Sequence, residues 1–385
     1  MVDSQFIAAS PEDVGIDSEK LDALLMRARK EVDDGLLPGC QVAIARHGKI
    51  AALASFGSAT DESLFNVFSS TKAITSAAGW LVMQDGKLRM DERVSDIVPE
   101  FGTHGKNEIT VEQLFTHTAG FPHAPFRTAE WFDHKRRMER FSEWTLNWPV
   151  GSRFEYHPTS SMYVIAELVE RRSNMQFHEF VRERISKPLG LAEMFLPCPR
   201  EQYHRIVPVT HVGEALTEKD YAALGVPMPP VTEVTEDALT AFNTTETRLV
   251  PVPGGGGIMS AATLALFYQG LLNGRALGGS EIWRKQTLDA ALKVRNNYPD
   301  LMGIPVNRAL GVVVAGDEHR NARGFGHTNS PLAFGHGGAG GQIAWGDPTT
   351  GLSFGYVTNG LDQHAVREPR RTTALASLAA VCATG

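Results

Sequence analysis

The first part of the chain has the pattern of a helix followed by two strands. Between residues 17 and 35, leucine, alanine and valine recur every three or four positions, which is the spacing of one face of an amphipathic helix. An aspartate or serine at its start can cap it, and Gly35 can end it. Two apolar runs, residues 40–46 and 50–56, flank His47-Gly48-Lys49, and this arrangement predicts a β-hairpin.

Residues 73–83 predict a helix in the centre of the protein. They are apolar on nearly every side, and a helix of this kind has no face to present to water. Several of them are small, which lets neighbouring elements approach closely, and Asp85-Gly86 ends the helix. Lys72, which directly precedes this segment, is therefore expected to be withdrawn from solvent.

The middle of the chain predicts helices joined by loops. Residues 110–116 begin with a Thr-Val-Glu-Gln capping box, and residues 160–172 and 176–185 carry amphipathic patterns. Residues 128–147 combine charged with aromatic residues, which favours a helix and a loop at the side of a cleft. Residues 197–253 are rich in proline and threonine and have little periodicity, so we expect loops with short elements.

The C-terminal part returns to strands. Residues 310–315, 342–347 and 352–359 have strand patterns, with a Pro-Thr-Thr-Gly turn between the last two. Helices are expected at residues 261–272 and 365–380. Strands thus cluster towards both ends of the sequence with helices between them. This order predicts an α+β architecture in which a helical insertion interrupts a sheet domain.

The composition is that of an ordinary globular protein. The chain has 385 residues, of which 42% are hydrophobic and 21% charged, and its formal net charge is -7. Neither this charge nor any cluster of lysine and arginine favours binding to nucleic acid. No apolar run approaches the roughly 20 residues that span a membrane. Residues 1–10 lack the basic and apolar segments of a secretory signal, so we expect a cytoplasmic location.

Cysteine and histidine give no sign of a disulfide framework or a metal site. The three cysteines, Cys40, Cys198 and Cys382, are far apart in the sequence and form no CxxC pair. Cys40 and Cys382 lie in apolar surroundings, which favours small core residues. The thirteen histidines include no HExxH or HxH motif, so we expect no metal and no other cofactor.

Ser69 and Lys72 are the first candidates for chemistry. They are three residues apart at the start of the predicted central helix, so the lysine amine can reach the serine hydroxyl. A helix N-terminus and a desolvated, basic lysine would together activate the serine as a nucleophile without a histidine. The alternative is a helix cap followed by a solvated lysine, which the apolar character of residues 73–83 makes less favourable.

Two further stretches could complete such a site. Tyr156 lies on a loop directly before the helix at residues 160–172, and its alternative role is an aromatic anchor at the helix entry. The run from His336 to Gly341 leads into a predicted strand, and its many small residues would let a substrate approach the backbone closely. The alternative for this run is a bulge or bend in the sheet.

Four consecutive glycines, Gly254 to Gly257, could suggest a phosphate-binding loop. The run lacks the Gly-Lys-Ser/Thr ending of that motif. We therefore expect a tight turn in which the backbone approaches a neighbouring element closely.

Three of these motifs together resemble the serine β-lactamase-like hydrolases. They are Phe68-Ser69-x-x-Lys72, Gly151-Ser-x-Phe-x-Tyr156 and His336-Gly337-Gly338. The branch that they resemble most is the class C β-lactamase-related esterases, the family VIII carboxylesterases. Supporting stretches are Leu114–Gly120, Pro188–Leu191 and Gly255–Ser260, and the resemblance extends over about residues 10–380.

The resemblance implies a β-lactamase/transpeptidase-like fold. Its antiparallel sheet, flanked by terminal helices, would comprise residues 1–75 and 250–385, and a mainly helical domain would comprise residues 76–249. The active site would lie at the interface of the two domains. Residues 121–148 and the loops at 200–250 would wall an acyl pocket there.

The resemblance also implies catalytic roles. Ser69 would be the acylated nucleophile, and Lys72 would be its base. Tyr156 would face both residues and carry a proton between the serine, the leaving group and the deacylating water.

The third motif would form the edge strand beside Ser69, with His336, Gly337 and Gly338 on the substrate side. The backbone N–H groups of Ser69 and Ala339 would form the oxyanion hole. His336 stands where β-lactamases have a lysine, as in many esterase relatives.

Like His336, a second difference from the β-lactamases favours esters over lactams as substrates. Class C β-lactamases have an asparagine two residues after the tyrosine, and it binds the amide of the antibiotic. Here this position is Pro158, which has no donor side chain. The resemblance therefore implies a serine carboxylesterase that forms an acyl-enzyme with a small-molecule ester.

Three other functions stay open. An acyltransferase would use the same acyl-enzyme with an alcohol or amine in place of water. Weak β-lactamase or peptidase activity would use the same machinery, but Pro158 and the expected cytoplasmic location count against it. A non-catalytic protein of the same fold would not need to keep Ser69, Lys72 and Tyr156 together.

Overall fold

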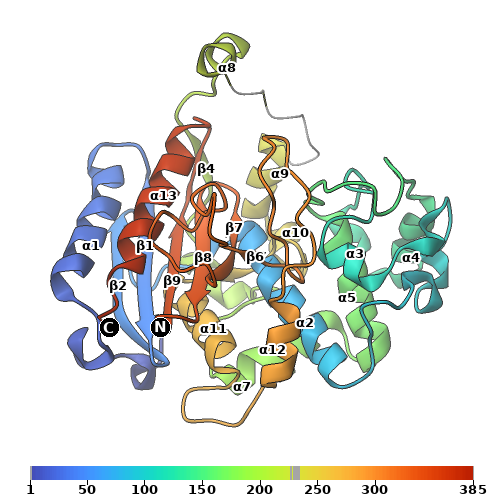
Figure 1. Cartoon of the computed structure of the whole chain (residues 1–385), viewed down its shortest axis with the longest axis horizontal. Helices are drawn as coiled ribbons and strands as arrows, with labels where there is room; N and C mark the ends of the chain where they lie inside the picture. Colours follow the sequence, from blue (N-terminus) through green and yellow to red (C-terminus); the bar gives the residue numbers. More distant parts are fainter. Residues whose placement is uncertain (1, 226–227, 229–234, 385) are drawn as a thin grey trace.

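A six-stranded antiparallel sheet is the frame on which the rest of the chain is arranged (Figure 1). The computed structural model describes residues 2–225, 228 and 235–384. The strands follow one another in the order β2-β1-β9-β8-β7-β6, so both ends of the sequence share one sheet. This sheet confirms the predicted α+β architecture. Its strands are β1 Gly39–Arg46, β2 Lys49–Gly57, β6 Val313–Val314, β7 Phe334–Gly338, β8 Gln342–Asp347 and β9 Leu352–Thr358.

Both predicted hairpins are present in the sheet. β1 and β2 are joined by His47 and Gly48, whose φ angles of 55° and 79° belong to a tight left-handed turn. β8 and β9 are joined by the Pro-Thr-Thr-Gly turn and pair from Asp347 and Leu352 onwards. Each apolar run therefore forms a strand because its neighbour in sequence provides an antiparallel partner.

Alternate residues of the central strands face two separate cores. Val42 and Ile44 point towards the terminal helices, whereas Ala43 and Ala45 point to the opposite face. The small residues on that second face allow α11 (Ala261–Asn273) to lie against β1, β8 and β9.

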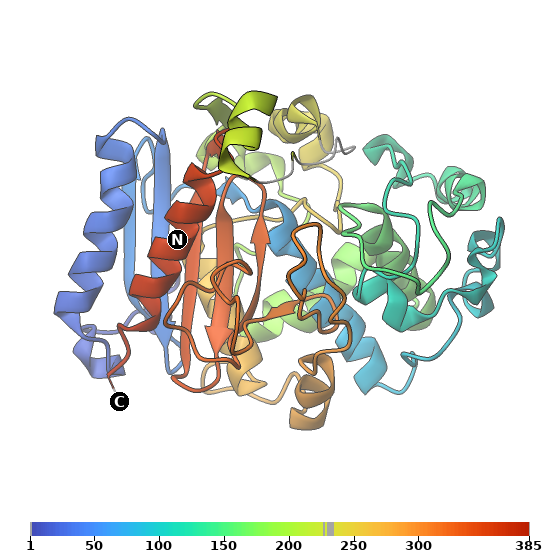
Figure 2. The same ribbon diagram turned by 45° about the horizontal axis from the view of Figure 1, so that its top comes forward.

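Two helices from opposite ends of the chain cover the first face. α1 (Ser18–Asp33) and α13 (Arg367–Ala380) lie side by side in Figures 1 and 2. The carboxylate of Asp17 caps α1, as predicted. Between the helices, the buried guanidinium of Arg371 donates to Glu31 at 2.8 Å. Since both charges are withdrawn from water, this pair fixes α1 against α13.

Helix α2 (Thr71–Gln84) runs through the centre of the molecule, as Figure 2 shows. Every side chain from Thr71 to Val82 is buried, which confirms the central helix predicted from its apolar pattern. Cys40 and Cys382 are also buried, in the core beneath α1 and α13, as predicted.

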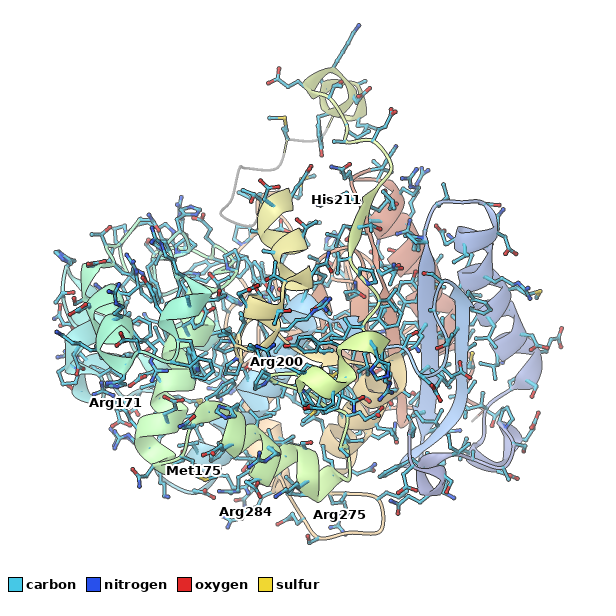
Figure 3. All side chains as sticks on the ribbon, turned by 180° about the vertical axis from the view of Figure 1, so that it is seen from behind. Arg171, Met175, Arg200, His211, Arg275 and Arg284 are labelled. Atoms are coloured by element: carbon cyan, nitrogen blue, oxygen red, sulfur yellow. The ribbon has the colours of Figure 1, made fainter. Side chains whose placement is uncertain are left out.

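The middle of the chain forms the helical part at the right of Figure 1, which Figure 3 shows from behind. α3 begins with the predicted capping box. A π-helix at Arg182–Ser186 joins α6 to α7, so the helix expected at residues 176–185 continues to Leu189. The helices are α3 Val111–Phe115, α4 His134–Glu143, α5 Ser160–Ser173, α6 Phe177–Val181 and α7 Lys187–Leu189.

The remaining elements are short, as expected for residues 197–253. α8 stands away from the body in Figures 1 and 3, and none of its side chains is buried. β4 and β10 form a parallel pair that the sequence pattern did not predict. These elements are β3 Phe65–Asn66, β4 Thr210–Val212, α8 Glu218–Leu224, α9 Glu236–Thr240, α10 Thr245–Arg248, β5 Ile258–Met259, α12 Lys285–Ala291 and β10 Gly360–Asp362. In the ranges that the structure describes, no helix has the length and apolar character to cross a lipid bilayer.

The strand predicted at residues 310–315 is wrong for most of its length. Only β6, Val313–Val314, is strand, because Gly311 adopts a φ of 79° and turns the chain. The N–H of Gly311 donates to the carbonyl of Phe115 at 3.2 Å instead of to a neighbouring strand. β6 therefore pairs only with the first two residues of β7, and the rest of β7 is the free edge of the sheet.

Candidate active site

One pocket of about 730 Å³ brings the three predicted motifs together. Its lining includes Ser69, Tyr156 and the run from His336 to Ala339. Lys72 lies behind Ser69 and is fully buried. The wall segments expected at residues 121–148 and 200–250 contribute Phe126, Thr128, Ala238, Leu239 and Phe242.

Ser69 lies on a strained turn that leads into α2. Phe68–Ser70 form one turn of 3₁₀-helix, and Phe68 has a φ of 44°, a left-handed conformation that is rare for a residue with a side chain. The N–H of Gly257 donates to Thr71 Oγ1 at 2.9 Å and fixes the first residue of α2. Ser69 is left partly exposed in the pocket, while the residues on both sides of it are buried.

The glycine run at 254–257 packs its backbone against α2, as predicted. A Cβ atom at Gly257 would lie only 2.7 Å from Thr71 Oγ1, so a larger residue does not fit there. At the other end of the run, a Cβ atom at Gly254 would lie 3.4 Å from Lys72 Nζ. The glycines thus bring a backbone segment next to the lysine amine.

The amine of Lys72 is surrounded by three oxygen atoms. Its Nζ lies 3.0 Å from Ser69 Oγ, 2.7 Å from the Pro158 carbonyl and 2.8 Å from the Gly254 carbonyl. Pro158 has no donor or acceptor in its side chain, but its backbone oxygen supplies an acceptor for the lysine. The contact between Lys72 and Ser69 is the one that a serine–lysine nucleophile requires.

Burial and neighbouring charges shift the pKa of Lys72. Burial lowers the pKa of this amine below its usual value of 10.5, because the charged form loses its hydration. The cation of Arg308 lowers the pKa further, whereas Tyr156 raises it. A buried lysine with a lowered pKa is suited to act as a general base.

The ring of Tyr156 lies near the amine of Lys72, the guanidinium of Arg308 and two imidazole rings. Lys72 Nζ is 5.1 Å and Arg308 Cζ is 5.3 Å from its centroid. The ring centroids of His117 and His336 are 4.8 and 6.1 Å away. Tyr156 thus lies beside Lys72, and its role as a proton carrier stays a prediction.

His117 holds the loop that carries Tyr156. Its carbonyl accepts the N–H of Glu155 at 3.2 Å, and its Nδ1 accepts the N–H of His157 at 3.2 Å. Because Nδ1 is an acceptor, the ring proton is on Nε2. Burial, reinforced by Arg308 and other nearby cationic groups, lowers the pKa of His117 well below its usual value, so this ring stays neutral.

Replacing His117 with leucine is expected to lower kcat about tenfold with little change in KM, because leucine cannot accept the His157 N–H and the Tyr156 loop loses its support. His117→Asn should restore most of the rate. Its Oδ1 occupies nearly the position of Nδ1, and asparagine tolerates the φ of 57° found here. Steady-state kinetics on both variants, with circular dichroism as a folding control, tests this. Equal rates for the two variants would contradict it.

Arg308 is a site residue that the sequence patterns did not reveal. Its Nη1 lies 3.3 Å from His336 Nε2, while His336 Nδ1 lies 2.6 Å from the Gly337 carbonyl. The ring therefore carries its proton on Nδ1 and accepts from Arg308 through Nε2. Burial, with Arg308 and Lys72, lowers the pKa of His336 well below its usual value. His336 is thus a neutral acceptor for Arg308, and its lone pair is not available as a base for a substrate.

The third motif places the free edge of β7 against the turn before α2. Ser70 Oγ donates to the carbonyl of His336 at 3.1 Å. A Cβ atom at Gly338 would collide with the carbonyl oxygen of Val67, so only glycine permits this approach. Ala339 follows directly and lines the pocket. Its role in an oxyanion hole stays a prediction.

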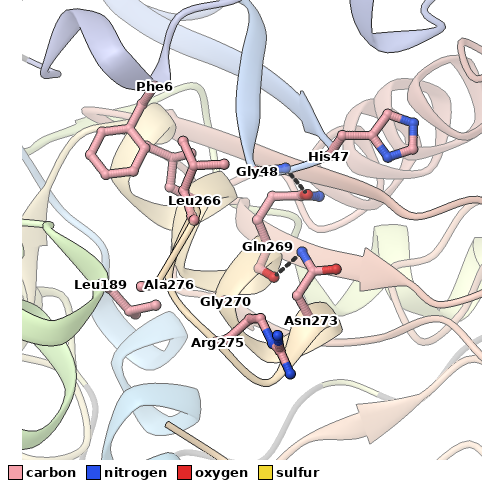
Figure 4. Close-up of a pocket in the computed structure, with 12 residues that line it drawn as sticks. Phe6, His47, Gly48, Leu189, Leu266, Gln269, Gly270, Asn273, Arg275 and Ala276 are labelled. Atoms are coloured by element: carbon pink, nitrogen blue, oxygen red, sulfur yellow. Dashed lines mark hydrogen bonds between the residues drawn. The ribbon is translucent and has the colours of Figure 1, made fainter. Parts of the chain in front are cut away.

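A second hollow, of about 370 Å³, lies at the C-terminal end of α11 (Figure 4). There the N–H of Gly48 donates to Gln269 Oε1 at 2.8 Å, and Asn273 Nδ2 donates to the Gln269 carbonyl at 2.9 Å. The described residues that line this hollow include no serine, threonine or cysteine. It therefore offers no hydroxyl or thiol nucleophile, in contrast to the Ser69 pocket.

Comparison with known proteins defines the family. The sequence profile of the beta-lactamase family matches residues 26–379, and the chain therefore belongs to this family. It is also similar to the esterase/beta-lactamase LipL of Mycobacterium tuberculosis, with 25% identity over 311 residues that cover 77% of this chain and 69% of the relative.

Two solved structures share the fold. A penicillin-binding protein homolog from Caulobacter crescentus superposes with a TM-score of 0.77 and 25% identity, covering 95% of this chain and 98% of the other. A family VIII carboxylesterase superposes with a TM-score of 0.77 and 22% identity, covering 95% and 99%. They confirm the β-lactamase/transpeptidase-like fold that the motifs implied.

Proposed function

We propose that this chain is a serine esterase that cleaves carboxylic esters through an acyl-enzyme on Ser69. The observation that carries the proposal is the 3.0 Å contact between Lys72 Nζ and a partly exposed Ser69 Oγ on the lining of the pocket. A buried amine in contact with a solvent-accessible hydroxyl is the arrangement that makes serine nucleophilic.

The surroundings of Lys72 direct its lone pair towards the serine. A neutral amine has two N–H groups, and the carbonyls of Pro158 and Gly254 lie within 2.8 Å to accept them. The lone pair is then left for the O–H of Ser69. After it has taken this proton, the ammonium donates back to the same oxygen.

Acylation would follow from this geometry. Ser69 Oγ attacks the ester carbonyl carbon, its proton passes to Lys72, and the N–H groups of Ser69 and Ala339 would bind the oxyanion. The C–O bond to the alcohol then breaks, and the alcohol leaves with a proton relayed by Tyr156. In deacylation, water attacks the carbonyl carbon of the acyl-enzyme and Tyr156 carries its proton towards Ser69 Oγ. The bond from Ser69 Oγ to the acyl carbon then breaks, which releases the carboxylic acid and restores the Ser69 hydroxyl.

Ester substrates fit this site better than lactams do. Pro158 contributes only a backbone oxygen, which is already bonded to Lys72, so no side chain at this position binds an amide. His336 is neutral where β-lactamases have a lysine cation. An acyltransferase that uses the same acyl-enzyme is the second candidate, because the pocket of about 730 Å³ has room for an acceptor alcohol.

The domain division is part of the proposal. We assign residues 1–75 and 250–385 to the sheet domain and residues 76–249 to the helical domain. The support is that both groups of residues line the Ser69 pocket. The cytoplasmic location expected from the sequence stays a prediction.

A panel of acyl donors tests the proposal. The purified protein is expected to hydrolyse p-nitrophenyl esters with a kcat/KM at least about 100-fold above that for nitrocefin or a D-alanyl-D-alanine peptide. Acid-quenched samples should carry one acyl group on the Ser69 peptide by mass spectrometry. Faster turnover of nitrocefin or the peptide would contradict ester specificity. Absence of any adduct would favour a non-catalytic protein, and faster acyl transfer to added alcohol than to water would favour a transferase.

A further inference from the structure

One wall of the Ser69 pocket contains a charged group without a protein partner. We define this sheet-side wall by residues that come from β8, α13 and the loops around residues 300 and 323: Asp300, Arg323, Gly341, Gln342, Glu368 and Thr372. Four of the polar side chains hydrogen-bond to backbone groups: Asp300, Arg323, Gln342 and Thr372. Among the described residues, none donates to the carboxylate of Glu368 or forms an ion pair with it.

Glu368 lies directly over the turn between β7 and β8. A Cβ atom at Gly341 would lie 3.2 Å from Glu368 Cγ and 3.8 Å from Cδ. Ala339, the predicted oxyanion donor, is two residues away in the same turn, so its Cα is at most about 7 Å from that of Gly341. The carboxylate therefore lies within reach of one end of a small substrate whose carbonyl is bound at Ser69.

The charges around Glu368 are engaged elsewhere. Arg371, one turn further along α13, donates to Glu31 and Asp362 at 2.8 and 2.5 Å. Arg367 also binds Asp362. On the wall itself, Arg323 donates to backbone carbonyls. Arg371 lowers the pKa of Glu368 through space, but no cation in the described part of the chain forms a hydrogen bond or an ion pair with the Glu368 carboxylate.

The pKa of Glu368 supports a role near neutral pH. Burial raises the pKa of this carboxyl to about 7, with Asp362 raising it and Arg371 lowering it. The anionic fraction of this group therefore rises as the pH increases through the neutral range. A ligand cation would be bound more strongly as the pH rises through this range.

A second part of the lining has a different character. This helix-side wall is apolar and mainly aromatic, and it consists of Phe126, Phe154, Tyr163, Leu239, Phe242 and Val252. Such a wall suits an acyl chain and gives no partner to a polar alcohol. The pocket thus offers an apolar surface and a charged group to different parts of a substrate.

We infer that Glu368 binds a cationic group on the alcohol part of the substrate, and that the substrate class is esters of amino alcohols with apolar acyl chains. The inference rests on the proposed esterase function of the same pocket. The ammonium group would lie against the sheet-side wall, with the acyl chain on the helix-side wall.

A pair of isosteric esters tests this inference. Butyrylcholine is compared with its carbon isostere, in which a tert-butyl group replaces the trimethylammonium group, at pH 6 and pH 8. The ratio of kcat/KM values, charged over neutral, should rise with pH in the wild type and fall about fivefold at pH 8 in Glu368→Gln. Glu19→Gln is the matched control, since Glu19 is also a first-turn glutamate of a long helix but is exposed and outside the pocket.

Turnover of the neutral ester shows that each variant is folded and competent. A ratio that is the same in wild type and Glu368→Gln would overturn the inference while leaving the esterase proposal intact. If no ester is turned over, calorimetric binding of the two esters to Ser69→Ala still decides it. The inference is supported if Ser69→Ala binds the charged ester more tightly than the neutral one and if adding Glu368→Gln removes this difference. Equal binding of the two esters to Ser69→Ala overturns it.

Discussion

Replacing Ser69 with alanine is expected to lower kcat/KM for p-nitrophenyl butyrate by at least about 10⁴-fold, a loss of about 5 kcal/mol of transition-state stabilisation. The acyl adduct should also disappear, because Ser69 is the one serine whose hydroxyl lies within hydrogen-bond distance of Lys72 Nζ among the described residues. The protein should keep its fold, since the hydroxyl is partly exposed and alanine fits the turn.

Ser76→Ala is the matched control for this change. Ser76 is a buried serine on the same helix whose hydroxyl has no hydrogen-bond partner in the described structure, and it does not line the pocket. Its removal should leave kcat/KM within about threefold of the wild type. Equal activity of Ser69→Ala and Ser76→Ala would refute the nucleophile assignment.

Replacing Lys72 with methionine is expected to lower kcat about 10³-fold, the usual contribution of a general base. Methionine fills a similar volume but cannot take the proton of Ser69, and it leaves the carbonyls of Pro158 and Gly254 without a donor.

In the wild type, activity should rise with pH as the amine of Lys72 loses its proton. Because burial lowers the pKa of Lys72, this rise should be complete below the usual lysine value of 10.5.

Lys106→Met separates this effect from a loss of stability. Lys106 is also fully buried and donates to backbone carbonyls, those of Thr103 and Trp144, but it does not line the pocket. Thermal unfolding should show that both variants are destabilised. Only Lys72→Met should lose activity per folded molecule, and only in this variant should activity no longer rise with pH. A similar loss of kcat in both variants would show that Lys72 acts through stability.

The sequence correctly predicted those helices and strands whose formation depends on residues close to one another in the chain. The β1–β2 and β8–β9 hairpins and the central helix α2 were recognised because pairing, turn chemistry and burial are local there. The strand at residues 310–315 failed because its apolar pattern does not show that Gly311 turns the chain. A left-handed glycine is compatible with both a strand end and a turn.

In the candidate site, too, the local contacts could be predicted from the sequence and the long-range contacts could not. Ser69 and Lys72 were recognised because their contact is set by the three-residue spacing on one helix. Arg308 was missed because it reaches His336 across 28 residues of sequence, from an isolated β-bridge with no motif of its own. His117 belongs to the Leu114–Gly120 stretch used for the resemblance, but its bond to His157 depends on how two loops meet. Only the folded structure gives these contacts.

The strand order also has a consequence for synthesis of the protein. β1 lies between β2 and β9, so the first hairpin to leave the ribosome stays unpaired along one edge until residues 352–358 are made. β7, which borders the turn at Phe68–Ser70, is likewise made long after Ser69 and Lys72. A polypeptide released early contains Ser69 and Lys72 but lacks the strand that completes their pocket. The pocket around Ser69 can therefore form only after β7 has been made.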